Sequence, residues 1–137
     1  MIGVDTNVLV RFLVEGDEPQ QSALATSLFA SGRVAIAHTV LLEAEWVLRQ
    51  SFKFQRGEIV AAFLRLLGLP NVACDRRDLV IGALRAFENG CDFADAFHLA
   101  TSTAEVAEFV TFDREFVSQA EAQGLLPRVR LLHPSPI

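Results

Sequence analysis

Two aspartates in this chain directly follow short apolar runs, where a carboxylate can take part in chemistry. Asp5 comes after Ile-Gly-Val, and Asp113 comes after Phe-Val-Thr-Phe. Each run has the length and β-branched content of a buried strand, and a helical pattern follows each aspartate. The carboxyl ends of parallel strands share one edge of a sheet, where ligands bind. We therefore expect both carboxylates at a common binding edge, with capping of the following helix as the alternative role of each.

Two more acids, Glu43 and Asp95, lie near the starts of predicted helices, so they can reach the same edge. Carboxylates that cluster raise one another's pKa, and a hard divalent cation removes that conflict. Oxygen ligands of this kind suit Mg²⁺ or Mn²⁺, and no convergent set of histidines or cysteines favours zinc. The four acids therefore predict a metal site suited to phosphodiester hydrolysis.

Other polar residues near these acids have simpler explanations. Glu45 precedes Arg49 by four residues and is expected to form an exposed ion pair, but periodicity alone does not separate its role from that of Glu43. Asp92 is predicted to cap the helix that begins near residue 94. His98 lies on the same helix, and we expect a structural role for it rather than that of a general base.

Strand and helix patterns alternate along the chain. Apolar periodicity predicts strands near residues 2–4, 34–36, 72–74, 108–112 and 129–132, and helices near 6–14, 19–30, 39–52, 59–67, 75–88, 94–103 and 114–122. Alternation of this kind implies right-handed βαβ units and an α/β fold. The expected sheet is mostly parallel, has four to five strands and is covered by helices.

Composition predicts one well-filled domain without a membrane span. The chain has 137 residues, 51% of them hydrophobic, and contains no apolar run long enough to cross a bilayer. We expect a single domain over residues 1–133, a flexible tail over 134–137, a cytoplasmic location, and reduced thiols at Cys74 and Cys91. The net charge of −5 argues against a protein that coats long nucleic acids, but a bound metal ion can supply positive charge locally.

Four stretches of the chain, in order, resemble the PIN domain ribonucleases, and specifically the VapC-type toxins of bacterial toxin-antitoxin pairs. They are Val4–Arg11, Leu42–Arg49, Asp92–Ala96 and Thr111–Asp113. The combination is far more specific than any single stretch. Within the second stretch the family pattern places its glutamate three residues before the aromatic residue, which selects Glu43 over Glu45.

The resemblance implies a PIN-like three-layer α/β/α sandwich and a metal-dependent endoribonuclease toxin that hydrolyses tRNA, rRNA or mRNA. Its catalytic and metal-binding residues would be Asp5, Glu43, Asp95 and Asp113, with Mg²⁺ or Mn²⁺ as the cofactor. Thr6 is expected to cap the first helix and orient Asp5, with further support from Asn7, Asp92 and Thr111. Basic residues beside the motifs give possible RNA contacts at Arg11, Arg49, Lys53 and Arg114.

The resemblance also implies a cognate VapB-type antitoxin as inhibitor and a homodimer, for which Leu42 and Trp46 offer apolar contact residues. The alternative is a catalytically silent PIN-like module that only binds RNA or protein. Aspartyl phosphatases and phospho-receiver domains fit poorly, because position 7 is Asn and the only lysine is Lys53.

Overall fold

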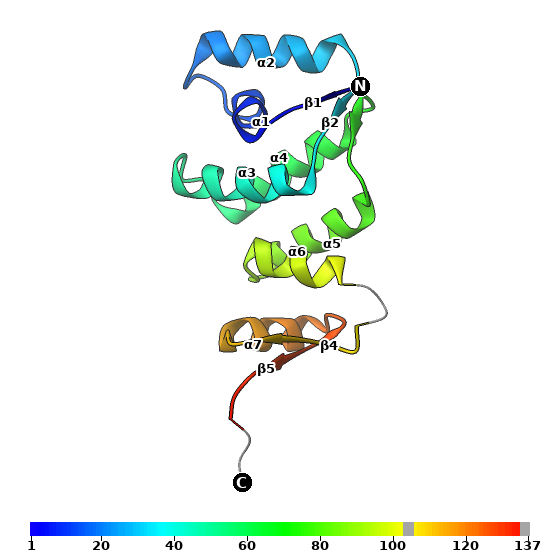
Figure 1. Cartoon of the computed structure of the whole chain (residues 1–137). Coiled ribbons are helices and arrows are strands. Elements are labelled where there is room, and N and C mark those ends of the chain that lie inside the picture. The colour runs from blue at the N-terminus through cyan, green and yellow to red at the C-terminus, as the bar shows by residue number, and fades with distance from the viewer. Residues whose placement is uncertain (103–105, 135–137) are drawn as a thin grey trace. The chain divides into compact units, whose positions relative to one another are not determined.

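The computed structural model describes residues 1–102 and 106–134 (Figure 1). The chain divides into two compact units, unit 1 over Met1–Arg77 and unit 2 over Asp78–Ile137, and each is described by itself. A single domain over residues 1–133 stays a prediction. Of the expected tail, residues 135–137 lie outside the described residues, and the helix end expected near residue 103 falls in the other gap.

Unit 1 is built on a parallel sheet of three short strands in the order β1-β2-β3. Ile2 pairs with Val34 and Val34 with Val72, which aligns the three strands in register. The elements in chain order are β1 (Ile2–Gly3), α1 (Thr6–Leu13), α2 (Pro19–Ser31), β2 (Val34–Ala35), α3 (His38–Gln50), α4 (Arg56–Gly68) and β3 (Val72–Ala73). Helix α1 packs against both α2 and α3.

Local sequence signals explain where the helices of unit 1 begin. Pro19 occupies the first turn of α2, where its missing N–H is no loss. Helix α4 begins at Arg56, three residues before the expected start at Ile59. The reason is a cap: the Gln55 N–H donates to the Glu58 side chain at 2.9 Å, which stabilises the first turn.

Helix α3 buries only part of the face that helical periodicity predicts. That face holds Val40, Ala44, Val47, Leu48 and Ser51, of which Ala44 and Leu48 are buried together with Leu41 and Glu45. Glu45 is only 3% exposed, so its predicted exposure is wrong, although the predicted pair with Arg49 forms at 2.7 Å. The error arises because Glu43 and Glu45 both flank the apolar face, and packing alone decides which of them turns inward.

In its described residues, 78–102 and 106–134, unit 2 holds three helices and a two-stranded parallel sheet. Its elements are α5 (Arg77–Glu88), which begins at the unit boundary, α6 (Phe93–Thr101), β4 (Glu108–Thr111), α7 (Arg114–Gln123) and β5 (Arg128–Leu131). Phe93 is fully buried, and its ring meets those of Phe87 and Phe97 edge-on at 5.6 and 5.5 Å. Gly90 follows α5 at φ +121°, and a Cβ there would lie 2.8 Å from the side chain of Gln119 in α7.

The predicted α/β class and parallel strand pairing are confirmed. All pairs among the described strands are parallel, in a three-stranded sheet in unit 1 and a two-stranded sheet in unit 2. The pattern of two cysteines without ligand spacing predicts core thiols at both, but only Cys91 is buried, and Cys74 is half-buried. Among residues 1–102 and 106–134, no helix is long and apolar enough to cross a membrane.

Candidate functional site

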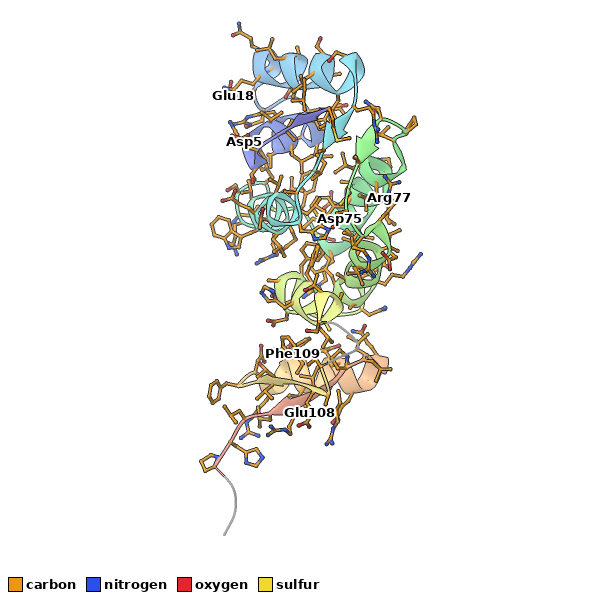
Figure 2. The ribbon with its side chains drawn as sticks, turned by 45° about the vertical axis from the view of Figure 1, so that its right-hand side comes forward. Asp5, Glu18, Asp75, Arg77, Glu108 and Phe109 are labelled. Atoms are coloured by element: carbon orange, nitrogen blue, oxygen red, sulfur yellow. The ribbon has the colours of Figure 1, made fainter. Side chains whose placement is uncertain are left out.

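Asp5 lies where β1 leads into α1, as the sequence predicts (Figure 2). Its Oδ1 accepts a hydrogen bond from the Val8 N–H at 3.0 Å, so Asp5 itself caps the helix. The expectation that Thr6 takes over the capping role is wrong, because Thr6 is the first residue inside the helix. The cap uses one carboxylate oxygen and fixes the side chain, which leaves Oδ2 for a further partner.

A groove of about 770 Å³ brings Asp5 and Glu43 to the same surface of unit 1. One wall comes from the first turns of α1, and the other comes from α3 and the turn after it. Thr6 and Asn7, predicted as supporting residues, also line this groove, as does Arg11. The groove therefore brings the strand–Asp–helix motif and the glutamate of α3 to one surface, and their role as a catalytic site stays a prediction.

Asp113 repeats in unit 2 the arrangement of Asp5 in unit 1. It follows β4 and caps α7, with Oδ1 accepting from the N–H groups of Glu115 at 2.9 Å and Phe116 at 3.2 Å. The hydroxyl of Thr111 accepts from the Asp113 N–H at 3.0 Å, which fixes the backbone at this acid. Thr111 thus supports Asp113, as predicted, and Oδ2 of Asp113 is again left for another partner.

Asp95 is the acid whose charge is least favourable. It lies in the first turn of α6, which Asp92 caps as predicted by accepting from the Asp95 N–H at 3.1 Å. Burial raises the pKa of Asp95 above its ordinary value of 3.8, and the negative charges of Asp92 and Asp113 raise it further, while His98 lowers it. The charges of Asp92 and Asp113 therefore reach the Asp95 carboxylate.

Removal of the Asp95 charge is expected to stabilise the metal-free protein. The pKa of Asp95 is higher in the folded protein than in the unfolded chain. As the pH rises above the ordinary pKa, the unfolded chain loses this proton more readily than the folded protein does, so Asp95 lowers the free energy of unfolding. In EDTA at neutral pH, Asp95→Asn should raise Tm by about one to a few degrees. Thermal unfolding followed by circular dichroism measures this, and a lowered Tm would contradict it. Asp92→Asn keeps a cap residue and removes only one of the charges that raise the Asp95 pKa, so it should raise Tm less.

The donor atoms present fit a hard divalent cation. Asp5, Glu43, Asp95 and Asp113 offer carboxylate oxygens, the ligands that Mg²⁺ and Mn²⁺ prefer, and mutual repulsion around Asp95 is what a cation relieves. Within the described parts of the chain, however, no three His, Cys, Asp or Glu side chains form a group that could hold a metal ion. The four-acid set takes two members from each unit and stays a prediction.

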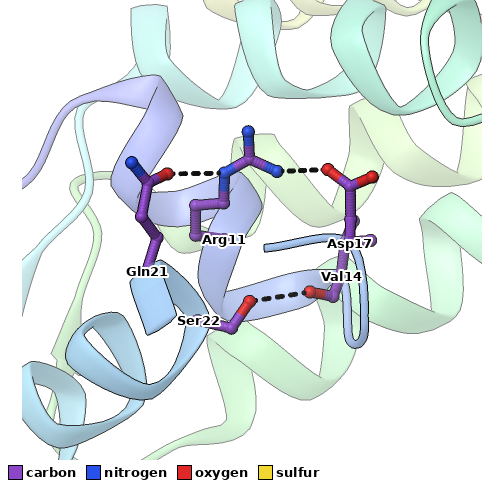
Figure 3. Close-up of polar contacts among 5 residues, drawn as sticks. All are labelled: Arg11, Val14, Asp17, Gln21 and Ser22. Carbon is purple, nitrogen blue, oxygen red and sulfur yellow. Dashed lines mark hydrogen bonds and ion pairs between the residues drawn. The ribbon is translucent and has the colours of Figure 1, made fainter. Parts of the chain in front are cut away.

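Arg11 has partners inside unit 1 (Figure 3). Its guanidinium donates from Nη1 to Asp17 at 2.6 Å and from Nε to Gln21 at 3.0 Å, and so ties the loop after α1 to the start of α2. The Ser22 hydroxyl donates to the Val14 carbonyl beside it at 3.3 Å. This predicted RNA contact therefore also holds one wall of the groove in place.

Loss of the two Arg11 contacts, to Asp17 and to Gln21, is expected to lower the free energy of unfolding. Arg11→Met keeps the aliphatic stem but removes an ion pair and a hydrogen bond, which together contribute about 1 kcal/mol for partly exposed groups. Urea unfolding measures the change. Asp17→Asn should cost less, and its effect should shrink at high salt, because only the charge is lost. An unchanged urea midpoint for Arg11→Met would show that these two contacts do not stabilise the fold.

The other predicted RNA contacts differ in their surroundings. Arg49 pairs with the buried Glu45, whereas Lys53 is exposed in the turn after α3 and Arg114 is exposed at the start of α7. His98 is exposed on α6. Sequence reasoning did not assign Thr39, Ser51 and Phe52 to the site, but all three line the groove. The signal for the first two is helical spacing, since each lies four or eight residues from Glu43.

Comparisons with known proteins relate this sequence to a family. The sequence matches the PIN domain family over residues 2–122. Among solved structures, the chain is similar to Mycobacterium tuberculosis VapC20, described as a sarcin-ricin loop cleaving toxin, with 24% sequence identity and a TM-score of 0.43. That likeness covers 92% of this chain and 97% of the other. No curated protein matches the sequence.

Proposed function

This chain belongs to the PIN domain family, and we propose that it is a divalent-metal-dependent endoribonuclease of the VapC toxin type. Its substrate would be RNA, with tRNA, rRNA and mRNA as the candidate classes. The observation that supports this most strongly is the groove of unit 1, where Asp5 at a strand end and Glu43 on α3 share one surface in a chain of this family.

Each acid has a distinct structural reason to serve as a ligand. The capping hydrogen bonds of Asp5 and Asp113 use Oδ1 of each carboxylate, which leaves Oδ2 for a metal ion. Glu43 is exposed in the groove. The charge of Asp95 is disfavoured without a counter-ion. These four residues would hold Mg²⁺ or Mn²⁺. Such an ion supplies Lewis-acid stabilisation of the phosphate and a water molecule of lowered pKa for hydrolysis.

The remaining groups of the site would orient the acids and the substrate. Thr111 fixes the backbone of Asp113, and Asp92 fixes the first turn of α6 that carries Asp95. Asn7 lines the groove beside Asp5, where its amide can hydrogen-bond to the RNA strand or to the carboxylate. Lys53 and Arg114 are the exposed cations best suited to hold RNA phosphates.

A cleavage assay on purified protein tests the proposal. With Mg²⁺ or Mn²⁺, the protein should cleave total RNA or structured tRNA, and EDTA should abolish the cleavage. Calorimetric titration with Mn²⁺ should show binding in the absence of RNA. Absence of both metal binding and cleavage would overturn the proposal, whereas RNA binding without cleavage would favour a silent binding module.

The proposal includes an inhibitory partner and self-association. A cognate VapB-type antitoxin would block the acidic groove, and a homodimer would use Trp46, which is 54% exposed on α3, with Leu42 half-buried beside it. If a small open reading frame lies immediately upstream of the gene, co-expression of its product should suppress cleavage. Sedimentation analysis of the wild type and of Trp46→Ser tests the dimer, which the variant should weaken.

A further inference from the structure

The side chains that line the groove of unit 1 change from charged to apolar and aromatic along α3. Glu43, Val47 and Ser51 follow one another at four-residue spacing and line the same wall, which ends at the aromatic ring of Phe52. Eight residues of helix span roughly 12 Å. The wall thus runs from a carboxylate, where the proposed cleavage takes place, to an apolar end that no part of the proposed chemistry uses.

The turn after α3 fixes the position of Phe52. The Ser51 N–H donates to the Val47 carbonyl at 2.8 Å, and the Phe54 N–H donates to the Leu48 carbonyl at 3.0 Å. Lys53 reverses the chain between them at φ 57°. Phe52 is half-buried and lines the groove.

An RNA strand presents two chemically different groups, charged phosphates and flat bases. The ring of Phe52 suits a base, because bases stack on aromatic side chains in grooves that bind single strands. The exposed Lys53, next in the chain, suits a neighbouring phosphate. A metal-loaded acidic end, an aromatic end and an adjacent cation together match a short stretch of RNA strand better than they match a protein segment.

We propose that Phe52 forms a stacking subsite for an RNA base that flanks the cleaved phosphodiester. This inference rests on the proposed function and adds a residue that positions the substrate. Because stacked nucleotides rise about 3.4 Å each, the roughly 12 Å from Glu43 places this base within about three nucleotides of the cleaved bond. Base identity matters little in such a subsite, since every base has a stacking face.

The single tryptophan of the chain allows a direct spectroscopic test. A variant with Trp46→Phe and Phe52→Trp moves the only indole into the groove, and Asp5→Asn keeps the RNA intact. With Mg²⁺ present, an oligo(A) RNA of about ten nucleotides should quench the indole fluorescence, and an abasic strand of equal length should not. The matched control is Asp5→Asn with the native Trp46, which lies outside the groove. Equal quenching by both strands, or none, overturns the subsite.

Cleavage kinetics give a second, independent readout. Phe52→Leu should raise KM for RNA by about 5- to 150-fold with little change in kcat, the range expected for loss of one stacked base. Phe52→Tyr should restore binding, and Leu24→Ala, at an exposed position of α2 outside the groove, should leave KM unchanged. If the wild type cleaves RNA and Phe52→Leu has the same KM, the subsite is wrong and the nuclease stands. If oligo(A) quenches, the abasic strand does not, and the wild type cleaves no RNA, the subsite stands and the nuclease is wrong.

Discussion

Asp5→Asn is expected to abolish RNA cleavage without unfolding the protein. The substitution removes the negative charge of a proposed metal ligand, and even residues that only support ligands contribute about 10- to 100-fold to affinity or activity. We therefore expect kcat/KM to fall by at least about 100-fold. The cap should persist, because Asn is as good an N-cap as Asp and retains an oxygen to accept from the Val8 N–H.

Asp5→Ala is the matched variant that separates the two roles of this residue. It removes the charge and the cap together, so it should lose cleavage to the same extent and also lower the free energy of unfolding by about 1 kcal/mol. Cleavage of total RNA in Mn²⁺ and urea unfolding measure the two effects. Full activity in Asp5→Asn would remove Asp5 from the mechanism and leave it a helix cap alone.

Phe93→Ala is expected to be the most damaging single change in unit 2. The ring is fully buried and meets two further rings edge-on, so its removal leaves a cavity among aromatic side chains. Changes of this kind cost about 3–5 kcal/mol, against a total stability of about 5–15 kcal/mol for a typical domain. Since Phe93 is the first residue of α6, the helix that carries Asp95 should lose its anchor.

Urea unfolding of Phe93→Ala and Phe93→Leu tests this expectation. Leucine fills much of the space, so Phe93→Leu should cost clearly less than Phe93→Ala. Metal binding measured in the absence of RNA should weaken in the alanine variant, because the position of Asp95 depends on the position of its helix. Equal stability of the two variants would mean that the aromatic cluster does not hold unit 2 together.

The strand–aspartate–helix motifs could be read from sequence because every signal in them is local. At Asp5 and Asp113 a short apolar run, a capping residue and a helical pattern follow one another within about ten residues, and each residue restricts the backbone of its neighbours. The element boundaries of α2 and α7 were close to those predicted for the same reason. Where prediction failed locally, as at Thr6, two adjacent polar residues competed for one capping position.

The face that a helix buries was not available from local signals. On α3 the pattern allowed several stripes, and the structure buries Glu45 while Val47 and Ser51 line the groove. The partners of Arg11 were also hidden, because the loop that brings Asp17 and Gln21 to it is set by the packing of α1 on α2. Contacts of this kind depend on elements distant in sequence.

What the sequence alone determined is the position of Asp5 and Asp113 at strand ends and the α/β class, because these follow from residue type and short-range spacing. The four-acid metal site stays a prediction. The tertiary structure decided that Asp5 and Glu43 share a groove, that Glu45 does not belong to it, and that the groove ends at Phe52. The physical reason is packing: burial is a property of a whole helix pressed against its neighbours, and the nearest residues in the chain do not encode which neighbours those are.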